Sequence, residues 1–138
     1  MIALDTNVLA RFYVDDASDL EAVRQRPVAR RILAESESVM VPLTVILELE
    51  WVVRAFYGFG AEDFARVVEH LAGLPNVIVE DRPAVLAAVD LRRSGLDFAD
   101  ALHLVRSRGC ERLVTFDDRG FARRAKRLGV LPRVEVAR

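Results

Sequence analysis

Short runs rich in apolar residues alternate along the chain with longer stretches of helical periodicity. Runs typical of strands lie at residues 2–4, 39–41, 77–79, 113–116 and 134–136. Helical spacing of apolar residues, with glycine and proline at the boundaries, predicts helices at residues 6–14, 27–35, 43–57, 62–71, 83–93, 98–106 and 119–128. This alternation predicts an α/β fold, with a mainly parallel sheet of about five short strands and helices on both of its faces.

The ends of the predicted sheet are expected to differ in burial. Residues 2–4 are predicted to form a buried first strand and residues 134–136 an edge strand. Pro27 suits the first turn of its helix and follows the polar and charged residues 15–26.

The length and composition restrict the class of protein. With 138 residues, the chain is expected to form a single domain over residues 1–138. An apolar content of 52% is enough for a sizeable core and argues against disorder. The only cysteine, Cys110, excludes an internal disulfide and a zinc site built on several thiolates. Without a membrane-length apolar run or a signal peptide, we expect a soluble, cytoplasmic protein that contacts no membrane.

Charge is distributed unevenly along the chain, although the formal net charge is only −1. Residues 1–91 carry 8 basic and 15 acidic side chains, whereas residues 92–138 carry 12 basic and 6 acidic ones. The second part therefore presents either solvated helix faces or a basic surface for a polyanion or an acidic partner.

Two aspartates directly follow predicted strands, Asp5 after the first and Asp117 after the fourth. Ligands of open parallel sheets bind at the carboxyl ends of the strands, which makes both residues candidates for a site. Each also suits the N-cap of the helix that follows. The two roles are compatible because one carboxylate can cap a helix and still present an oxygen.

Glu48 is predicted to lie on an apolar face of its helix, without a basic residue three or four positions away. A carboxylate in such surroundings is unfavourable unless it is paired or binds a cation, so Glu48 is a candidate functional residue. The alternative is an ion pair with an arginine distant in sequence. Glu50 differs, because Arg54 four residues later accounts for it as an ordinary surface pair.

The segment D-F-A-D places Asp97 and Asp100 at a helix start. Asp97 is explained as a cap, whereas Asp100 is expected to turn inward among apolar neighbours. Asp118, next to Asp117, is expected to be solvated. Several carboxylates in one cleft stay ionised only near cations, and oxygen-only ligation favours Mg²⁺ or Mn²⁺. Such a site suits the hydrolysis of phosphodiesters.

At these residues the chain resembles the PIN-domain nucleases and, within them, the toxins of the VapBC type of toxin–antitoxin pair. The matching segments are I-A-L-D-T-N-V-L, T-V-I-L-E-L-E-W-V, G-L-D-F-A-D-A-L-H and L-V-T-F-D-D-R-G-F. The resemblance implies a three-layer α/β/α PIN-like fold and a Mg²⁺- or Mn²⁺-dependent endoribonuclease that an antitoxin protein inhibits. It also implies a homodimer.

The resemblance assigns roles to residues position by position. Asp5, Glu48, Asp100 and Asp117 match the catalytic, metal-binding acidic quartet, and Thr6, Asn7, Asp97 and Thr115 match residues that line the pocket. Many family members have an acid immediately before the phenylalanine of the last motif, but here that residue is Gly120. The fourth acid is then Asp117 or Asp118.

The RNA substrate is expected to lie across the basic C-terminal part of the chain. Candidate backbone contacts come from the last predicted helix: Arg119, Arg123, Arg124, Lys126 and Arg127. On that helix Arg119 and Arg123 are expected to share a face, as are Arg123 and Arg127. Phe59, between two glycines, has no helical face to bury it, so it faces a protein interface, with the antitoxin or a second copy of the chain, or the core of its own domain.

Other phosphate-handling classes fit less well. A haloacid-dehalogenase phosphatase needs an aspartate where Asn7 stands, and a receiver domain needs a lysine at a strand end, whereas Lys126 is the only lysine. The chain also has neither of the common glycine-rich nucleotide loops. The remaining alternative is a non-catalytic PIN-like module that binds RNA or a protein, and the complete acidic quartet argues against it.

Overall fold

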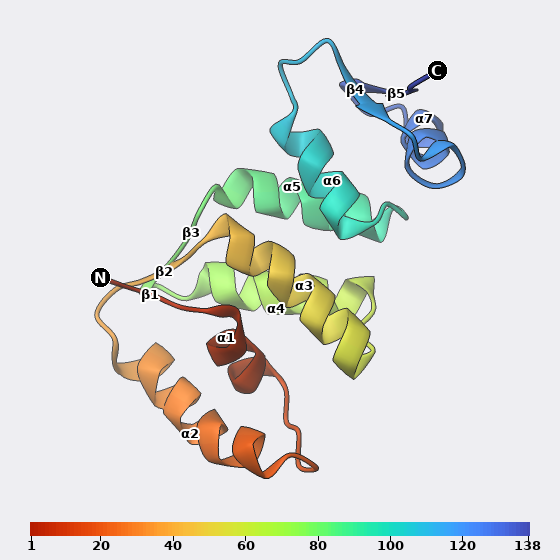
Figure 1. The fold of residues 1–138 in the computed structure, drawn as a ribbon. Helices are drawn as coiled ribbons and strands as arrows, with labels where there is room; N and C mark the ends of the chain where they lie inside the picture. The colour runs from red at the N-terminus through yellow and green to blue at the C-terminus, as the bar shows by residue number, and fades with distance from the viewer. The chain divides into compact units, whose positions relative to one another are not determined.

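The computed structural model describes residues 1–138 as two compact units, Met1–Arg82 and Pro83–Arg138 (Figure 1). The first unit contains β1 (Ile2–Ala3), α1 (Thr6–Tyr13), α2 (Leu20–Glu35), β2 (Val39–Val41), α3 (Leu43–Tyr57), α4 (Ala61–Gly73) and β3 (Val77–Val79). The second follows with α5 (Arg82–Arg93), α6 (Phe98–Arg106), β4 (Arg112–Thr115), the π-helix η1 (Asp118–Ala122), α7 (Arg123–Leu128) and β5 (Arg133–Val136).

The first unit is built on a three-stranded parallel sheet in the order β1-β2-β3. The register places Val39 beside both Ile2 and Val77, so β2 is the central strand. Val39 and Val41 of this strand are completely buried. Helices α1 and α2 form the crossover from β1 to β2, and α3 and α4 form the next one. Side chains at the carboxyl end of β1 and on α3 are thereby brought to one region of this unit.

The prediction of a buried first strand is wrong. Ile2 is 45% exposed and Ala3 is also exposed, because β1 is an edge strand that pairs only with β2. Only Leu4, just beyond the strand, is buried. Within the first unit, this apolar run therefore forms one edge of the three-stranded sheet.

Helix α2 begins at Leu20 rather than at Pro27. Asp19 caps it, because its Oδ1 accepts hydrogen bonds from the backbone N–H groups of Glu21 at 3.0 Å and of Ala22 at 3.4 Å. This cap starts the helix seven residues before the proline, which the helix accommodates in its interior. Part of the polar segment is thus helical, with α1 packed against it.

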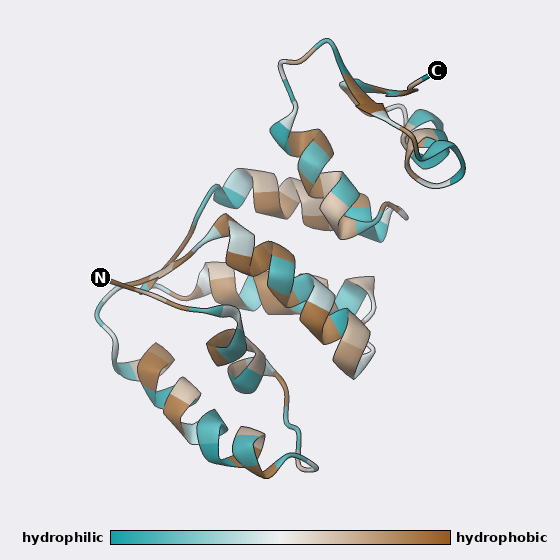
Figure 2. Ribbon diagram, viewed as in Figure 1, coloured by the Kyte–Doolittle hydropathy of each residue, from teal (hydrophilic) through white to brown (hydrophobic).

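Helix α3 runs from Leu43 to Tyr57, as predicted, and it positions Glu48. Figure 2 shows brown, apolar bands along most of this helix, and its buried apolar side chains are Val45, Ile46, Leu49 and Val53. The backbone N–H of Leu43 donates to Oε1 of Glu80 at 2.7 Å, which caps the start of the helix from the end of β3. Gly58 ends the helix in the left-handed conformation with φ +69°.

The second unit contains a separate two-stranded parallel sheet, β4-β5. Residues 119–128 do not form the single α-helix predicted from the sequence. The backbone N–H of Ala122 bonds to the carbonyl of Asp117 at 3.0 Å, five residues earlier, so the chain first makes a π-turn and then α7. Arg119 therefore lies in η1, whereas Arg123 is the first residue of α7. Arg123 and Arg127 both lie on α7, one turn apart.

The predicted α/β class with parallel strands is confirmed. All five predicted strands are present, divided between the sheets of the two units, and β5 is an edge strand as predicted. None of the helices is long and apolar enough to cross a membrane.

Candidate functional site

A pocket of about 400 Å³ in the first unit joins two of the predicted acids. Asp5 comes from the end of β1 and Glu48 from the middle of α3, although 42 residues lie between them. The complete lining is Asp5, Thr6, Asn7, Ala10, Arg11, Asp16, Glu48, Val52, Phe56 and Tyr57. The first turn of α1 thus provides three neighbouring polar residues at the rim that Glu48 shares.

Asp5 caps α1 and still presents an oxygen. Its Oδ1 accepts a hydrogen bond from the backbone N–H of Thr6 at 2.8 Å. Oδ2 has no protein partner, and the residue is exposed on the pocket side. The cap holds the carboxylate in place, as both sequence-based interpretations require.

The environments predicted for Glu48 and Glu50 are reversed. Glu48 is exposed and lines the pocket, so no desolvation penalty forces it to bind a cation. Glu50 is the buried carboxylate, only 5% exposed. Its two oxygens accept from Nε of Arg54 at 3.2 and 3.1 Å. The predicted pair between these two residues exists, but its acidic member lies in the core.

Thr6 supplies a buried polar atom that the protein leaves unsatisfied. The residue is 5% exposed, and Oγ1 has no hydrogen-bond partner. A buried hydroxyl without a partner is unfavourable, by about 1–3 kcal/mol. Thr6 lines the same pocket as Asp5 and Glu48, but its Oγ1 is itself buried, so the oxygens that the pocket exposes are those of the two carboxylates. Carboxylate oxygens fit Mg²⁺, which uses one or two carboxylates with water and substrate phosphates.

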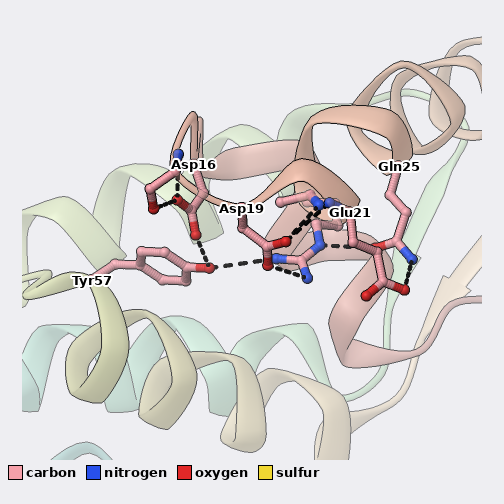
Figure 3. Close-up of polar contacts among 8 residues, drawn as sticks. Asp16, Asp19, Glu21, Gln25 and Tyr57 are labelled. Atoms are coloured by element: carbon pink, nitrogen blue, oxygen red, sulfur yellow. Dashed lines mark hydrogen bonds and ion pairs between the residues drawn. The ribbon is translucent and has the colours of Figure 1, made fainter.

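Three of the residues that line the pocket, Arg11, Asp16 and Tyr57, belong to a polar network (Figure 3). The Tyr57 hydroxyl donates to Oδ2 of Asp16 at 3.2 Å and accepts from Nη1 of Arg11 at 3.4 Å. Nε of Arg11 also donates to Oε1 of Gln25 at 2.9 Å, and Nη2 lies 3.6 Å from Oδ2 of Asp19. The network fixes the guanidinium of Arg11 in the same pocket as Asp5 and Glu48.

Neighbouring hydrogen-bond donors and the charge of Arg11 favour the ionised form of Asp16. The hydroxyl of Ser18 donates to its Oδ1 at 2.6 Å, which is the largest influence lowering the pKa of Asp16. Hydrogen bonds from Tyr57 and from the Ser18 backbone, and the charge of Arg11, lower this pKa further. The pocket therefore keeps a negative charge at Asp16, in addition to the positive charge of Arg11.

In the second unit, Asp97, Asp100 and Asp117 lie near one another. Asp97 caps α6, as predicted, and its Oδ1 accepts from the Asp100 backbone N–H at 3.2 Å. Asp100 is half-buried, and its pKa is raised, first by desolvation and then by the charges of Asp97 and Asp117. His103 and Arg124 act in the opposite direction. Asp100 is thus an inward-turned acid under like-charge repulsion, as the sequence predicts.

Asp117 is fixed at the start of η1 by its neighbours. Its Oδ1 accepts from the Gly120 backbone N–H at 2.8 Å, and its own N–H donates to Thr115 Oγ1 at 3.1 Å. A Cβ on Gly120 would lie 2.7 Å from the second carboxylate oxygen. The glycine found in place of the family acid thus gives the Asp117 carboxylate its room. Asp118 is exposed and is not among the charges that act on Asp100.

The structure therefore places the predicted site residues in two groups. Asp5, Glu48, Thr6 and Asn7 share the pocket of the first unit. Asp97, Asp100, Asp117, Asp118 and Thr115 belong to the second unit. Within neither unit do three acidic, histidine or cysteine side chains come together as a ready-made metal cage.

The basic residues predicted to contact RNA remain available for binding. All of them are exposed and none makes an ion pair within the protein: Arg119, Arg123, Arg124, Lys126 and Arg127. Arg124 also acts electrostatically on Asp100. The basic helix and the acidic group of the second unit are thus neighbours.

Sequence reasoning missed four residues that line this pocket: Arg11, Asp16, Phe56 and Tyr57. Their contacts join positions 41 and 46 residues apart, which no local spacing reveals. The exposed aromatic side chains of this segment are Trp51 and Phe56, at 51% and 68%. Phe59 is half-buried, because its N–H bonds back to the Val53 carbonyl at 3.0 Å.

The model of the PIN domain family matches residues 2–127, nearly the whole chain and both units. The protein therefore belongs to the PIN-domain family. PIN domains are generally nuclease modules that use divalent metal ions. No curated protein sequence matches the chain.

Proposed function

We propose that this PIN-domain protein is a Mg²⁺- or Mn²⁺-dependent endoribonuclease and the toxin of a VapBC-type toxin–antitoxin pair. The observation that carries the proposal is the pocket that brings the exposed carboxylates of Asp5 and Glu48 together, 43 positions apart in the sequence. The acids Asp100 and Asp117 of the second unit are the other half of the proposed catalytic set, and Asp97 supports them as a cap.

Asp5, Glu48, Asp100 and Asp117 are the proposed ligands of the divalent ion. When bound, the ion supplies positive charge against the phosphodiester and promotes ionisation of water. The protein keeps these ligands in place through backbone contacts, because Asp5 and Asp117 each accept a hydrogen bond from a helix N-terminus. Burial and then the like charges of Asp97 and Asp117 raise the pKa of Asp100, and a bound cation would favour its ionised form.

The exposed arginines and lysine of η1 and α7 are proposed to hold the RNA backbone. They give affinity without sequence choice and a marked dependence on salt. We place the activity in the cytoplasm, where RNA is available.

The proposed partners are an antitoxin protein and a second copy of this chain. A basic side chain of the antitoxin would neutralise the acidic rim at Asp5 and Glu48 and exclude the cation. The proposal of both partners is based on the resemblance to the toxin family and on the exposed acids.

The test is cleavage of single-stranded RNA by the purified chain, with and without Mg²⁺ or Mn²⁺. We expect metal-dependent cleavage that falls at least about 100-fold in Asp5→Asn and in Asp100→Asn, one acid from each unit. Glu37→Gln is the matched control, because Glu37 is an exposed acid outside the pocket. Parent protein that binds RNA without cutting it would favour the non-catalytic module instead.

A further inference from the structure

An exposed aromatic side chain lines the same pocket as the acids. Phe56 lines the pocket with Asp5 and Glu48 and remains 68% exposed. Trp51 contacts it edge to face, with ring centroids 5.4 Å apart and an interplanar angle of 90°. This contact supports the Phe56 ring, which keeps most of its surface free for a ligand.

Arg11 lies in the same pocket with its orientation already fixed. Its Nε and Nη1 are held by Gln25 and Tyr57 at 2.9 and 3.4 Å. Nη2 makes only the 3.6 Å ion pair with Asp19, so further N–H donors of the guanidinium remain for a ligand. A guanidinium that is oriented before binding loses little freedom when it binds a phosphate.

We propose that Phe56 and Arg11 form a nucleotide subsite of the nuclease, in which a base of single-stranded RNA stacks on Phe56 and a neighbouring phosphate binds Arg11. This inference rests on the proposed function, since it names how the same pocket takes its substrate. It adds a contact in the first unit to the basic surface of η1 and α7.

The chemistry of the pocket favours a nucleotide over a peptide. A nucleotide offers an aromatic face to Phe56 and one localised negative charge to the guanidinium of Arg11, so a single ligand uses both features of the pocket. Stacking also requires an unpaired base, which makes single-stranded RNA the expected substrate class.

The experiment measures binding apart from cleavage. Fluorescence anisotropy with labelled single-stranded RNA and with the corresponding duplex is recorded for the full chain in EDTA. We expect tighter binding of the single strand and a loss of about 5- to 100-fold in Phe56→Ala, with recovery in Phe56→Trp but not in Phe56→Leu. Leu20→Ala is the control, because Leu20 is a 77% exposed apolar residue outside this pocket.

Arg11 is tested in the same assay. Arg11→Met is expected to weaken binding about tenfold and to reduce its salt dependence by about one phosphate contact. Arg31→Met, which removes an exposed and unpaired arginine of α2, is expected to leave both unchanged. Melting temperatures of all variants confirm that they are folded.

The two proposals can fail separately. RNA affinity that is unchanged in Phe56→Ala overturns the subsite even if the parent cuts RNA. The same holds if that variant loses only a protein partner, because the aromatic face is then a protein-docking surface. Conversely, a parent that binds through Phe56 but never cleaves retains the subsite and overturns the nuclease.

Discussion

The hydroxyl of Tyr57, the last residue of α3, donates a hydrogen bond of 3.2 Å to Oδ2 of Asp16, which lies between α1 and α2. The same hydroxyl accepts from Arg11 at 3.4 Å. One phenol thus joins the end of α3 to the first crossover of the sheet. Both residues line the pocket that also contains Asp5.

Replacing Tyr57 by phenylalanine removes this link while keeping the ring. We expect the melting temperature of Tyr57→Phe to fall by about 3–5 °C, which corresponds to the loss of an ordinary hydrogen bond. Thermal melts of Tyr57→Phe, Asp16→Asn and the double variant form a cycle. If the two single effects simply add, the contact contributes nothing to stability.

Stability is expected to depend on pH through Asp16. Its pKa in the folded protein is lowered from the ordinary value of 3.8, so its carboxylate stabilises the fold above that pH. This contribution is lost as the pH falls through the lower, folded pKa. Asp16→Asn should therefore melt below the parent at pH 7, with a difference that shrinks towards pH 3. A difference independent of pH would contradict the assignment.

The charge of Asp100 is expected to affect stability in the opposite direction from that of Asp16. Its pKa is raised in the folded protein, first by burial, so its charge destabilises the fold once the pH exceeds the unfolded value. Asp100→Asn should melt above the parent at pH 7 in EDTA, and this advantage should vanish at low pH. Mn²⁺ should stabilise the parent more than the variant. Equal stabilisation by Mn²⁺ would remove Asp100 from the proposed ligands.

Gly120 is expected to be required for the position of Asp117. In Gly120→Ala the new Cβ would lie 2.7 and 2.8 Å from the carboxylate oxygens, so the carboxylate must move and lose its capping bond. We expect a loss of about 0.5–2 kcal/mol in the free energy of unfolding and a larger relative loss of RNA cleavage.

Gly73→Ala is the matched control for this change, because no atom lies within 4 Å of the Cβ it would add. It should be neutral or slightly stabilising, since alanine restricts the unfolded chain. Cleavage by Gly120→Ala at the rate of the parent would show that the position of the Asp117 carboxylate is unimportant.

The sequence predicts elements well where local signals agree. Helix α3 has its predicted bounds because an apolar periodic segment ends at a glycine that adopts a positive φ. Helix α2 was predicted to start late, because Pro27 resembles a first-turn proline, whereas the helix begins at Leu20, seven residues before it, with Asp19 as its cap. The π-turn at Asp118–Ala122 was missed, since a five-residue hydrogen bond leaves no pattern in the apolar residues.

The sequence was enough to select the candidate acids, but it did not show which of them are buried or what they contact. Glu48 and Glu50 lie about 200° apart around α3, so only one of them can face the core, and their neighbours in sequence do not show which. The structure buries Glu50. The links of Tyr57 to Asp16 and Arg11 depend on how α1 and α3 pack, which no spacing along the chain encodes.

The carboxylates of the two units leave the ribosome at different times. Asp5, Glu48 and the rest of their pocket belong to the first 57 residues, whereas Asp100 is added 52 residues after Glu48. At about 5–20 residues per second, the 43 residues from Tyr57 to Asp100 take about 2–9 s to synthesise. On the proposed function, a growing chain of intermediate length carries only half of its ligands, so we expect no cleavage of RNA before Asp100 has been added.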